Sequence, residues 1–128
     1  MEFVLIRHGD PDYSACVRGG INGQGFGLVP LSEKGLQQAR QVAAHPALAG
    51  AQLVLSSPYT RALQTAAEIV RATGLPLAVE PDLHELMADR SGAPHTREEM
   101  KQLHQEFLAC RGCWPEGGES PWETVEQL

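Results

Sequence analysis

Arg7, His8 and Gly9 combine residue types that can handle a phosphate group. They directly follow an apolar run, residues 3–6, which we expect to form a buried β-strand. The carboxyl end of such a strand is where ligands bind in parallel α/β sheets. A cation beside the imidazole disfavours its protonated form, which leaves a ring-nitrogen lone pair available for attack on phosphorus. The pattern therefore predicts a phosphate site with His8 as nucleophile, and the alternative is a histidine satisfied within the core.

Arg61 is the second candidate for binding phosphate oxygens. It follows a predicted strand over residues 53–56 and lies in the first turn of a helix that we expect to begin at Ser57 and Pro58. Free backbone N–H groups at that end of a helix favour an anion, and a guanidinium adds a fork that matches phosphate oxygens. The alternative is a solvated surface arginine, but its place after a strand favours a functional role.

Glu85 is the candidate proton donor. It follows the third predicted strand, residues 77–79, and a carboxyl group beside a bound dianion can protonate a leaving oxygen. Glu80 and Asp82 are alternatives by position, as is a loop acid that is only solvated. Because parallel strands end at one edge of a sheet, we expect this acid to meet the polar groups that follow the other two strands.

Capping and spacing patterns predict the elements that position these residues. Residues 10–31 form a long glycine-rich loop, interpreted either as a ligand-binding loop or as a flexible surface loop. Alternating strands and helices predict an α/β fold, a three-layer α/β/α arrangement with a mainly parallel central sheet. The predicted helices are one capped by Ser32 and ending before Pro46, one from Pro58 to Gly74, one after the capping box of Thr96 and Glu99, and one starting at Ser120 with Pro121 and Glu123.

Length and composition limit the possible functions. The 128 residues are expected to form one domain, residues 1–128, with 42% hydrophobic residues to build a core. The net charge of −6 argues against nucleic acid as the main partner, although a few arginines can still hold a small anion. No apolar run approaches the roughly 18 residues of a membrane span, and Arg7 interrupts the only N-terminal candidate for a signal peptide. We therefore expect no membrane partner and a cytoplasmic location.

Cys110 and Cys113 form an isolated C-x-x-C pair. A zinc site would need further ligands at suitable spacing, and the odd total of three cysteines is a poor disulfide framework. Ordinary thiols are the favoured interpretation, with a zinc or redox module as a remote alternative. The carboxylates Asp10, Asp12 and Asp89 are too scattered to suggest a magnesium site.

Three segments together resemble the histidine phosphatase superfamily, whose fold is that of phosphoglycerate mutase. They are residues 5–9, 31–39 and 56–66, and the first and third are highly specific in combination. Residues 83–85 and 117–120 match the looser later motifs of the family. The resemblance thus extends over nearly the whole chain.

The resemblance implies catalysis through a phosphohistidine intermediate. By the family pattern, His8 would accept the phosphoryl group, Arg7 and Arg61 would hold its oxygens, and Glu85 would be the proton donor. Asn22 matches a polar residue that contacts the phosphate. No metal or cofactor is expected, because the arginines supply the positive charge. The expected substrate is a small phosphorylated molecule.

The chain departs from the family pattern in two places. Family members have a second core histidine, followed by glycine, after a strand that comes later than the helix near Ser120, and this chain ends before it. The stretch after Glu85, residues 86–92, lacks the usual continuation with glycine and tryptophan. We therefore expect a C-terminally incomplete fold. The strand that carries His8 would then have an open apolar edge, which a second copy or strand exchange would cover.

The leading hypothesis is a phosphomonoester phosphatase, or the N-terminal portion of one. One alternative is a catalytically inactive phosphate-binding or interaction module of the same fold, and another is a phosphotransferase of the phosphoglycerate mutase type. The short spacing between Arg61 and Glu85 resembles the phosphatase branch more than a glycolytic mutase.

Overall fold

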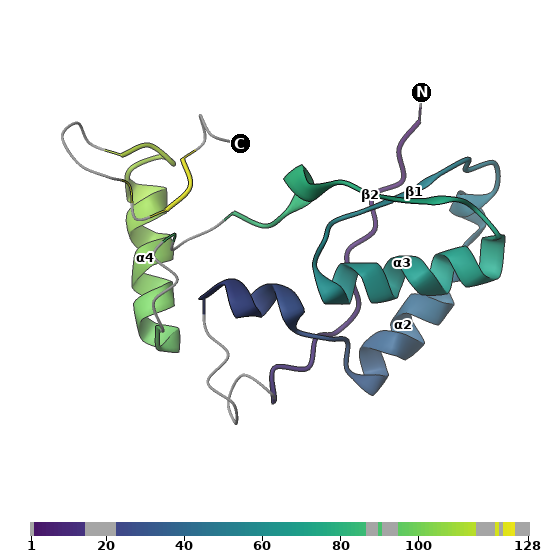
Figure 1. Ribbon diagram of the computed structural model, residues 1–128, viewed down its shortest axis with the longest axis horizontal. Helices are drawn as coiled ribbons and strands as arrows, with labels where there is room; N and C mark the ends of the chain where they lie inside the picture. Colours follow the sequence, from purple (N-terminus) through teal and green to yellow (C-terminus); the bar gives the residue numbers. More distant parts are fainter. Residues whose placement is uncertain are drawn as a thin grey trace.

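Two parallel strands and the helix that joins them form the centre of the molecule. The computed structural model describes residues 2–14, 23–86, 90, 95–114, 120 and 122–124. Strand β1 (Val54–Ser56) pairs in parallel with β2 (Leu77–Val79), and helix α3 (Thr60–Thr73) makes the crossover. Figure 1 shows α3 beneath these strands, with α2 beside it. The α/β class is confirmed, and both strands lie where the sequence predicts them.

Helix α2 (Glu33–Ala43) supports α3 and begins as predicted. The Ser32 hydroxyl accepts a hydrogen bond from Gly35 N at 3.0 Å, which satisfies one of the free N–H groups of the first turn. The buried face of α2 consists of small residues, including Ala39 and Ala43, so α3 can approach its backbone closely.

The start of α3 differs from the prediction by two residues. Tyr59, rather than Ser57, is the N-cap, and its side chain makes no capping hydrogen bond. The Ser57 hydroxyl instead accepts from Tyr59 N at 3.3 Å, so the serine stabilises a bend before the helix. The helix ends as predicted, because Gly74 adopts a left-handed conformation and donates to the Val70 carbonyl at 2.8 Å.

Residues 3–6 do not form the predicted strand. The segment runs without a ladder partner, and Phe3 and Leu5 are 76% and 95% exposed. In Figure 1 it crosses the β1–β2 pair instead of aligning with it. The apolar run predicted a strand covered on both faces, but strand formation requires a neighbouring strand to satisfy the backbone groups. None of the described residues provides one along this run.

The backbone after His8 is fixed by a close approach to α2. A Cβ atom added to Gly9 would overlap the Gly35 carbonyl, and one added to Gly35 would overlap the carbonyl of Asp10. Asp10 is bound on several sides: its N–H donates to Gln38 Oε1 at 2.8 Å, and its carbonyl accepts from Ser32 N at 2.9 Å. Glycine is required at both crossing positions because no side chain fits between the two backbones.

Helix α4 (Arg97–Ala109) lies to the side of this unit (Figure 1) and starts with the predicted capping box of Thr96 and Glu99. The helix predicted from Ser120 is not formed by the residues described there, Ser120 and 122–124. The Ser120 hydroxyl donates to the Trp122 carbonyl at 2.5 Å rather than capping a helix. Three short 3₁₀ helices complete the described elements: η1 (Gly23–Leu28), η2 (Pro46–Leu48) and η3 (Pro81–Leu83). None of the described helices is long and apolar enough to cross a membrane.

Gly35→Ala should destabilise the fold even though alanine favours helices. The gain in helix propensity is about 1 kcal/mol, but the new methyl group would force the Asp10 carbonyl away from α2. We expect a net loss of more than about 1 kcal/mol in the free energy of unfolding, measured by urea denaturation. Gly50→Ala is the control, because Gly50 has positive φ but open space around it, so only backbone strain applies. Equal or greater stability of Gly35→Ala would contradict the close approach.

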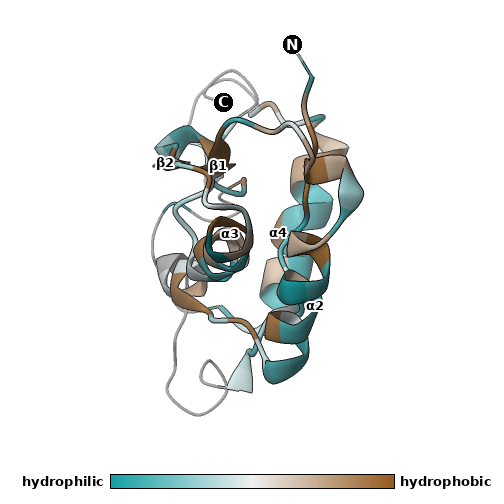
Figure 2. Cartoon of the chain, turned by 90° about the vertical axis from the view of Figure 1, so that its right-hand side faces the viewer, coloured by the Kyte–Doolittle hydropathy of each residue, from teal (hydrophilic) through white to brown (hydrophobic). Residues whose placement is uncertain are grey.

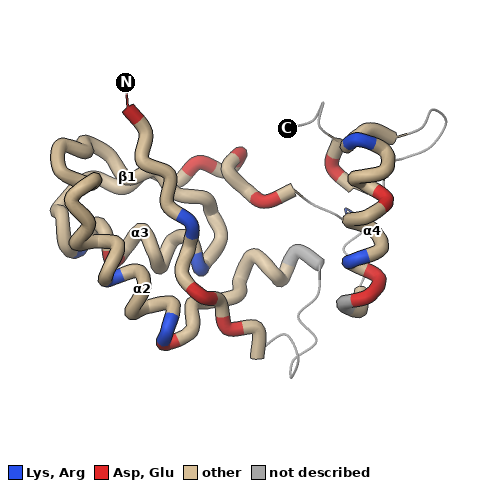
Figure 3. The backbone as a smooth tube through the Cα atoms, turned by 180° about the vertical axis from the view of Figure 1, so that it is seen from behind, with Lys and Arg blue, Asp and Glu red and all other residues tan. Residues whose placement is uncertain are grey.

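The N-terminal segment is also expected to drive self-association. Figure 2 shows apolar stretches along it at the outside of the molecule, and Figure 3 shows no charge between Glu2 and Arg7. The variant with Phe3→Asp and Leu5→Asp should lower the solution mass, measured by light scattering, towards 13.9 kDa. Leu108→Asp, on an exposed residue of α4, is the matched control and should leave the mass of the assembly unchanged. A wild-type monomer at all concentrations would rule this association out.

Candidate active site

The guanidinium of Arg61 lies at the centre of the candidate site. The residue is 2% exposed and lies in the first turn of α3. Its Nε donates to His8 Nε2 at 3.1 Å, its Nη1 donates to the Phe26 carbonyl at 2.8 Å, and its Nη2 lies 2.9 Å from Glu85 Oε2. The Tyr59 ring stacks on it, with the guanidinium carbon 4.7 Å from the ring centroid. The charge is therefore desolvated and held by acceptors from three separate segments.

The hydrogen bonds of His8 determine its tautomer. A guanidinium nitrogen only donates, so Nε2 of His8 must accept from Arg61 and cannot carry a proton. The proton is therefore on Nδ1, which lies 2.7 Å from the Gly9 carbonyl and donates to it. The His8 side chain is 19% exposed. The neutral ring thus directs the lone pair of Nε2 into the site.

Glu85 is the acidic residue that the structure brings to this site. Its Oε1 lies 4.0 Å from His8 Nε2, and its side chain is 66% exposed. Glu80 is used elsewhere, because its Oε1 accepts from Asp82 N at the start of η3. His8, Arg61 and Glu85 therefore converge as expected, and Glu85 is favoured over the alternatives that the sequence left open.

The other predicted site residues lie outside this cluster. Arg7 is exposed and makes no hydrogen bond or ion pair with the part of the chain that the structure describes. With His8 and Thr65 it lines a pocket of about 400 Å³ that is also lined by residues of α2, including Gln38 and Gln41. Asn22 lies outside the described residues. The N–H of Gly9 is donated to Thr65 Oγ1 at 3.2 Å.

Residues of α3 that the sequence reasoning missed hold the site in place. Thr65 Oγ1 accepts from Gly9 N and donates to the Arg61 carbonyl at 2.9 Å. Gln64 Oε1 accepts from Leu31 N at 2.6 Å. Both lie three or four residues after Arg61, on the same face of the helix. That spacing is the signal that could have identified them.

Tyr59 keeps its proton in this environment. Burial raises the pKa of the phenol above 10, the charge of Glu85 raises it further, and Arg61 opposes the shift. The hydroxyl donates to the Glu85 carbonyl at 3.4 Å, a long bond. Tyr59 thus contacts both Arg61 and the backbone of the candidate acid.

The described residues include no group of three or more side chains that could hold a metal ion. Cys110 and Cys113 are both free thiols.

The chain is similar to curated relatives over about two thirds of its length. It is 38% identical over 86 residues to a probable phosphoglycerate mutase GpmB of Enterobacter sp. (strain 638), and 35% identical to the one of Proteus mirabilis (strain HI4320). Each match covers 67% of this chain and 38% of the relative. The chain thus spans well under half the length of these relatives.

Solved structures share its fold. A putative alpha-ribazole-5'-P phosphatase from Escherichia coli matches with a TM-score of 0.59 and 27% identity, covering 95% of this chain and 58% of that one. A mycobacterial glucosyl-3-phosphoglycerate phosphatase with inorganic phosphate matches with a TM-score of 0.61 and 30% sequence identity. That match covers 89% of this chain and 52% of the other. The family model for the histidine phosphatase superfamily (branch 1) matches residues 3–128. The chain therefore belongs to the histidine phosphatase superfamily.

Proposed function

We propose that this protein hydrolyses phosphomonoesters through a phosphohistidine formed on His8. The observation that carries the proposal is the Nε2 lone pair of His8, which faces the guanidinium of Arg61 and lies 4.0 Å from a carboxylate oxygen of Glu85. A nucleophile, a cation for the phosphoryl oxygens and an acid thus meet within one hydrogen-bonded cluster.

The first chemical step forms a P–N bond to His8 Nε2 and breaks the P–O bond to the leaving group. The phosphoryl oxygens take over donors of Arg61 that now contact His8 and Glu85, which frees Nε2 to attack. Glu85, in its protonated form, gives its proton to the leaving oxygen. The Nδ1–H bond to the Gly9 carbonyl stabilises the ring as it gains positive charge.

The second step transfers the phosphoryl group to water. The P–N bond breaks, a P–O bond forms, and the Glu85 carboxylate takes the proton of the attacking water, which restores both residues. The 66% exposure of the Glu85 side chain gives water access to this point. This access, and the named phosphatases among the solved structures, support hydrolysis over transfer to a second substrate.

A phosphotransferase of the phosphoglycerate mutase type is the second candidate, supported by the names of the curated relatives. Such an enzyme returns the phosphoryl group from His8 to a hydroxyl of phosphoglycerate instead of passing it to water. Measuring isomerised phosphoglycerate against released phosphate separates the two activities.

Labelling of His8 tests the shared intermediate. Incubation with a phosphomonoester and rapid quenching should give an acid-labile phosphoryl group on His8 by mass spectrometry, and His8→Ala should lose both the label and phosphate release. His45→Ala is the control, because His45 lines the same pocket but caps η2. Phosphate binding without label or turnover would favour the inactive binding module. The absence of both the label on His8 and phosphate release would reject the proposal.

Glu85→Gln tests the proton donor through its dependence on the leaving group. With an alkyl phosphate, the variant should lose about 100-fold or more in kcat, because the leaving alkoxide needs a proton. With p-nitrophenyl phosphate the loss should be small, since nitrophenolate leaves without one. Asp82→Asn is the control, because Asp82 is exposed on η3. If Glu85→Gln lowers kcat by the same factor on both substrates, the assigned role is rejected.

A further inference from the structure

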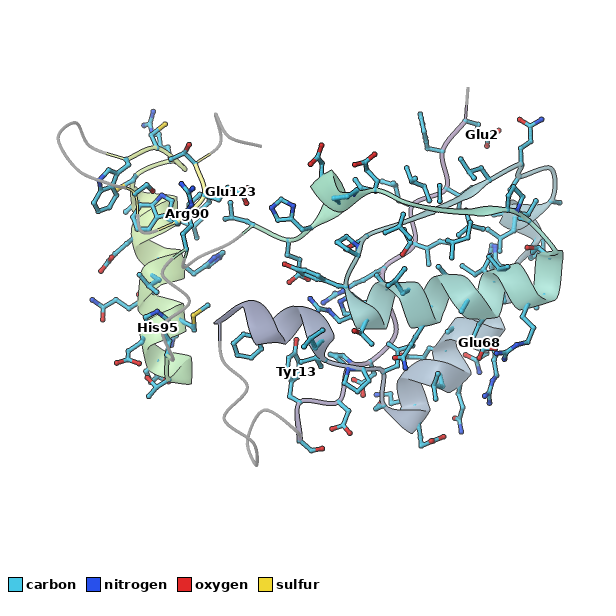
Figure 4. The ribbon with its side chains drawn as sticks, viewed as in Figure 1. Glu2, Tyr13, Glu68, Arg90, His95 and Glu123 are labelled. Atoms are coloured by element: carbon cyan, nitrogen blue, oxygen red, sulfur yellow. The ribbon has the colours of Figure 1, made fainter. Side chains whose placement is uncertain are left out.

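His84 and Glu123 form an ion pair directly beside the candidate acid. His84 Nε2 lies 3.0 and 2.9 Å from the two carboxylate oxygens of Glu123. Its Nδ1 lies 3.1 Å from the Pro81 carbonyl oxygen. Figure 4 shows Glu123 between α4 and the segment that follows β2. The pair thus joins two parts of the chain that are 39 residues apart.

The contacts require both ring nitrogens of His84 to donate. Carboxylate and carbonyl oxygens only accept, so the ring satisfies both partners only as an imidazolium. The hydrogen bond to Glu123, followed by the one to the Pro81 carbonyl, raises the pKa of His84 above its ordinary value of 6.5. The charged groups facing the ring are Glu123 from the C-terminal segment and Asp82 from η3, and both favour the protonated form.

Glu123 is held firmly enough to act as an anchor. Its side chain is 10% exposed, and the neighbouring Trp122 is fully buried. The Trp122 ring packs edge-on against Phe107 of α4 and against Trp114, with centroid distances of 6.1 and 4.8 Å. A carboxylate beside this aromatic cluster has little freedom to follow His84, so His84 is positioned by Glu123.

The backbone at His84 transmits this anchoring to Glu85. His84 has φ and ψ of −71° and 160°, in the polyproline II range, where successive side chains point in different directions. His84 therefore contacts Glu123 while Glu85 contacts Arg61. The Glu85 carbonyl accepts a hydrogen bond from the Tyr59 hydroxyl that is long, 3.4 Å, so the shorter contacts of the adjacent ion pair are the stronger constraint on the backbone of this loop.

We propose that the His84–Glu123 ion pair is a positioning element for the Glu85 carboxyl group. The inference rests on the proton-donor role proposed above for Glu85. It assigns the C-terminal segment around Trp122 a function in the reaction without any contact with the substrate.

Glu123→Gln tests the proposal, because it keeps the shape of the side chain and removes its charge. Hydrolysis of an alkyl phosphate should fall about tenfold in kcat with KM unchanged, while p-nitrophenyl phosphate is hydrolysed nearly as before. Adding Glu123→Gln to Glu85→Gln should cause no further loss, since both changes remove the same proton transfer. Glu98→Gln, an exposed acid of α4, is the matched control for lost charge.

The pH dependence gives a readout that a general loss of stability would not move. In the wild type, alkyl phosphate hydrolysis should decline as the pH rises through the raised pKa of His84 and the imidazolium is lost. In Glu123→Gln this decline should begin at lower pH, and the His84 titration seen by NMR should shift down in parallel. An unshifted titration would overturn the ion pair.

The NMR order parameter of the Glu85 amide separates failure of this inference from failure of the proposed function. It should fall from about 0.85 in the wild type to below about 0.6 in Glu123→Gln, whether or not the chain turns over substrate. An unchanged value overturns the positioning role. A second outcome also rejects the positioning role: Glu85→Gln shows the leaving-group effect, but Glu123→Gln lowers kcat equally for the alkyl phosphate and for p-nitrophenyl phosphate. In that case the role of Glu85 stands.

Discussion

The burial of one guanidinium organises this structure. Removing Arg61 from water is costly unless acceptors replace the lost hydration, and the chain supplies them from three separate segments: His8, η1 and the segment after β2. Those segments are fixed relative to α3 because each must bring its oxygen or nitrogen to one planar fork. A phosphoryl group offers the same kind of acceptors, so its entry can replace two protein contacts without leaving the cation unsatisfied.

Close packing of backbones holds His8 beside that cation. The crossing of Gly9 over Gly35 leaves no room for a side chain, and Thr65 bonds both Gly9 and the turn that carries Arg61. His8 is thus held by the residue after it, whereas the run before it, residues 3–6, is unpaired and largely exposed. The rigidity of the site comes from α2 and α3, and the expected strand contributes none of it among the described contacts.

The features that the sequence predicted correctly are mostly local. Ser32, Gly74 and the capping box of Thr96 act within one helical turn, so their residue types are sufficient to place the helix ends. The convergence of His8, Arg61 and Glu85 was also predicted, but the reason holds only in part. The parallel strands β1 and β2 bring Arg61 and Glu85 to one edge, whereas His8 follows a segment that forms no strand.

The failures involve partners that are distant in sequence or that compete locally. An apolar run such as residues 3–6 has strand propensity, but it forms a strand only where a second strand lies beside it. The residue types of the run do not show whether such a strand is present. The Ser57 hydroxyl could either cap the helix or stabilise a bend before it, and in the structure it accepts from Tyr59 N in the bend. Ser120 likewise bonds its own neighbour, Trp122, instead of starting a helix.

The motif at residues 83–85 shows how two neighbouring residues acquire different roles from one extended backbone. Its acid faces Arg61, and its histidine faces Glu123, so a single loop is bound on both sides. The sequence predicts Glu85 as the candidate acid from its place after a strand. The contact of His84 could not be predicted in this way, because its partner, Glu123, lies 39 residues later. The Glu85 carboxyl group is 66% exposed and is held near His8 by its contact with Arg61, and the His84–Glu123 pair is a second constraint on the same loop.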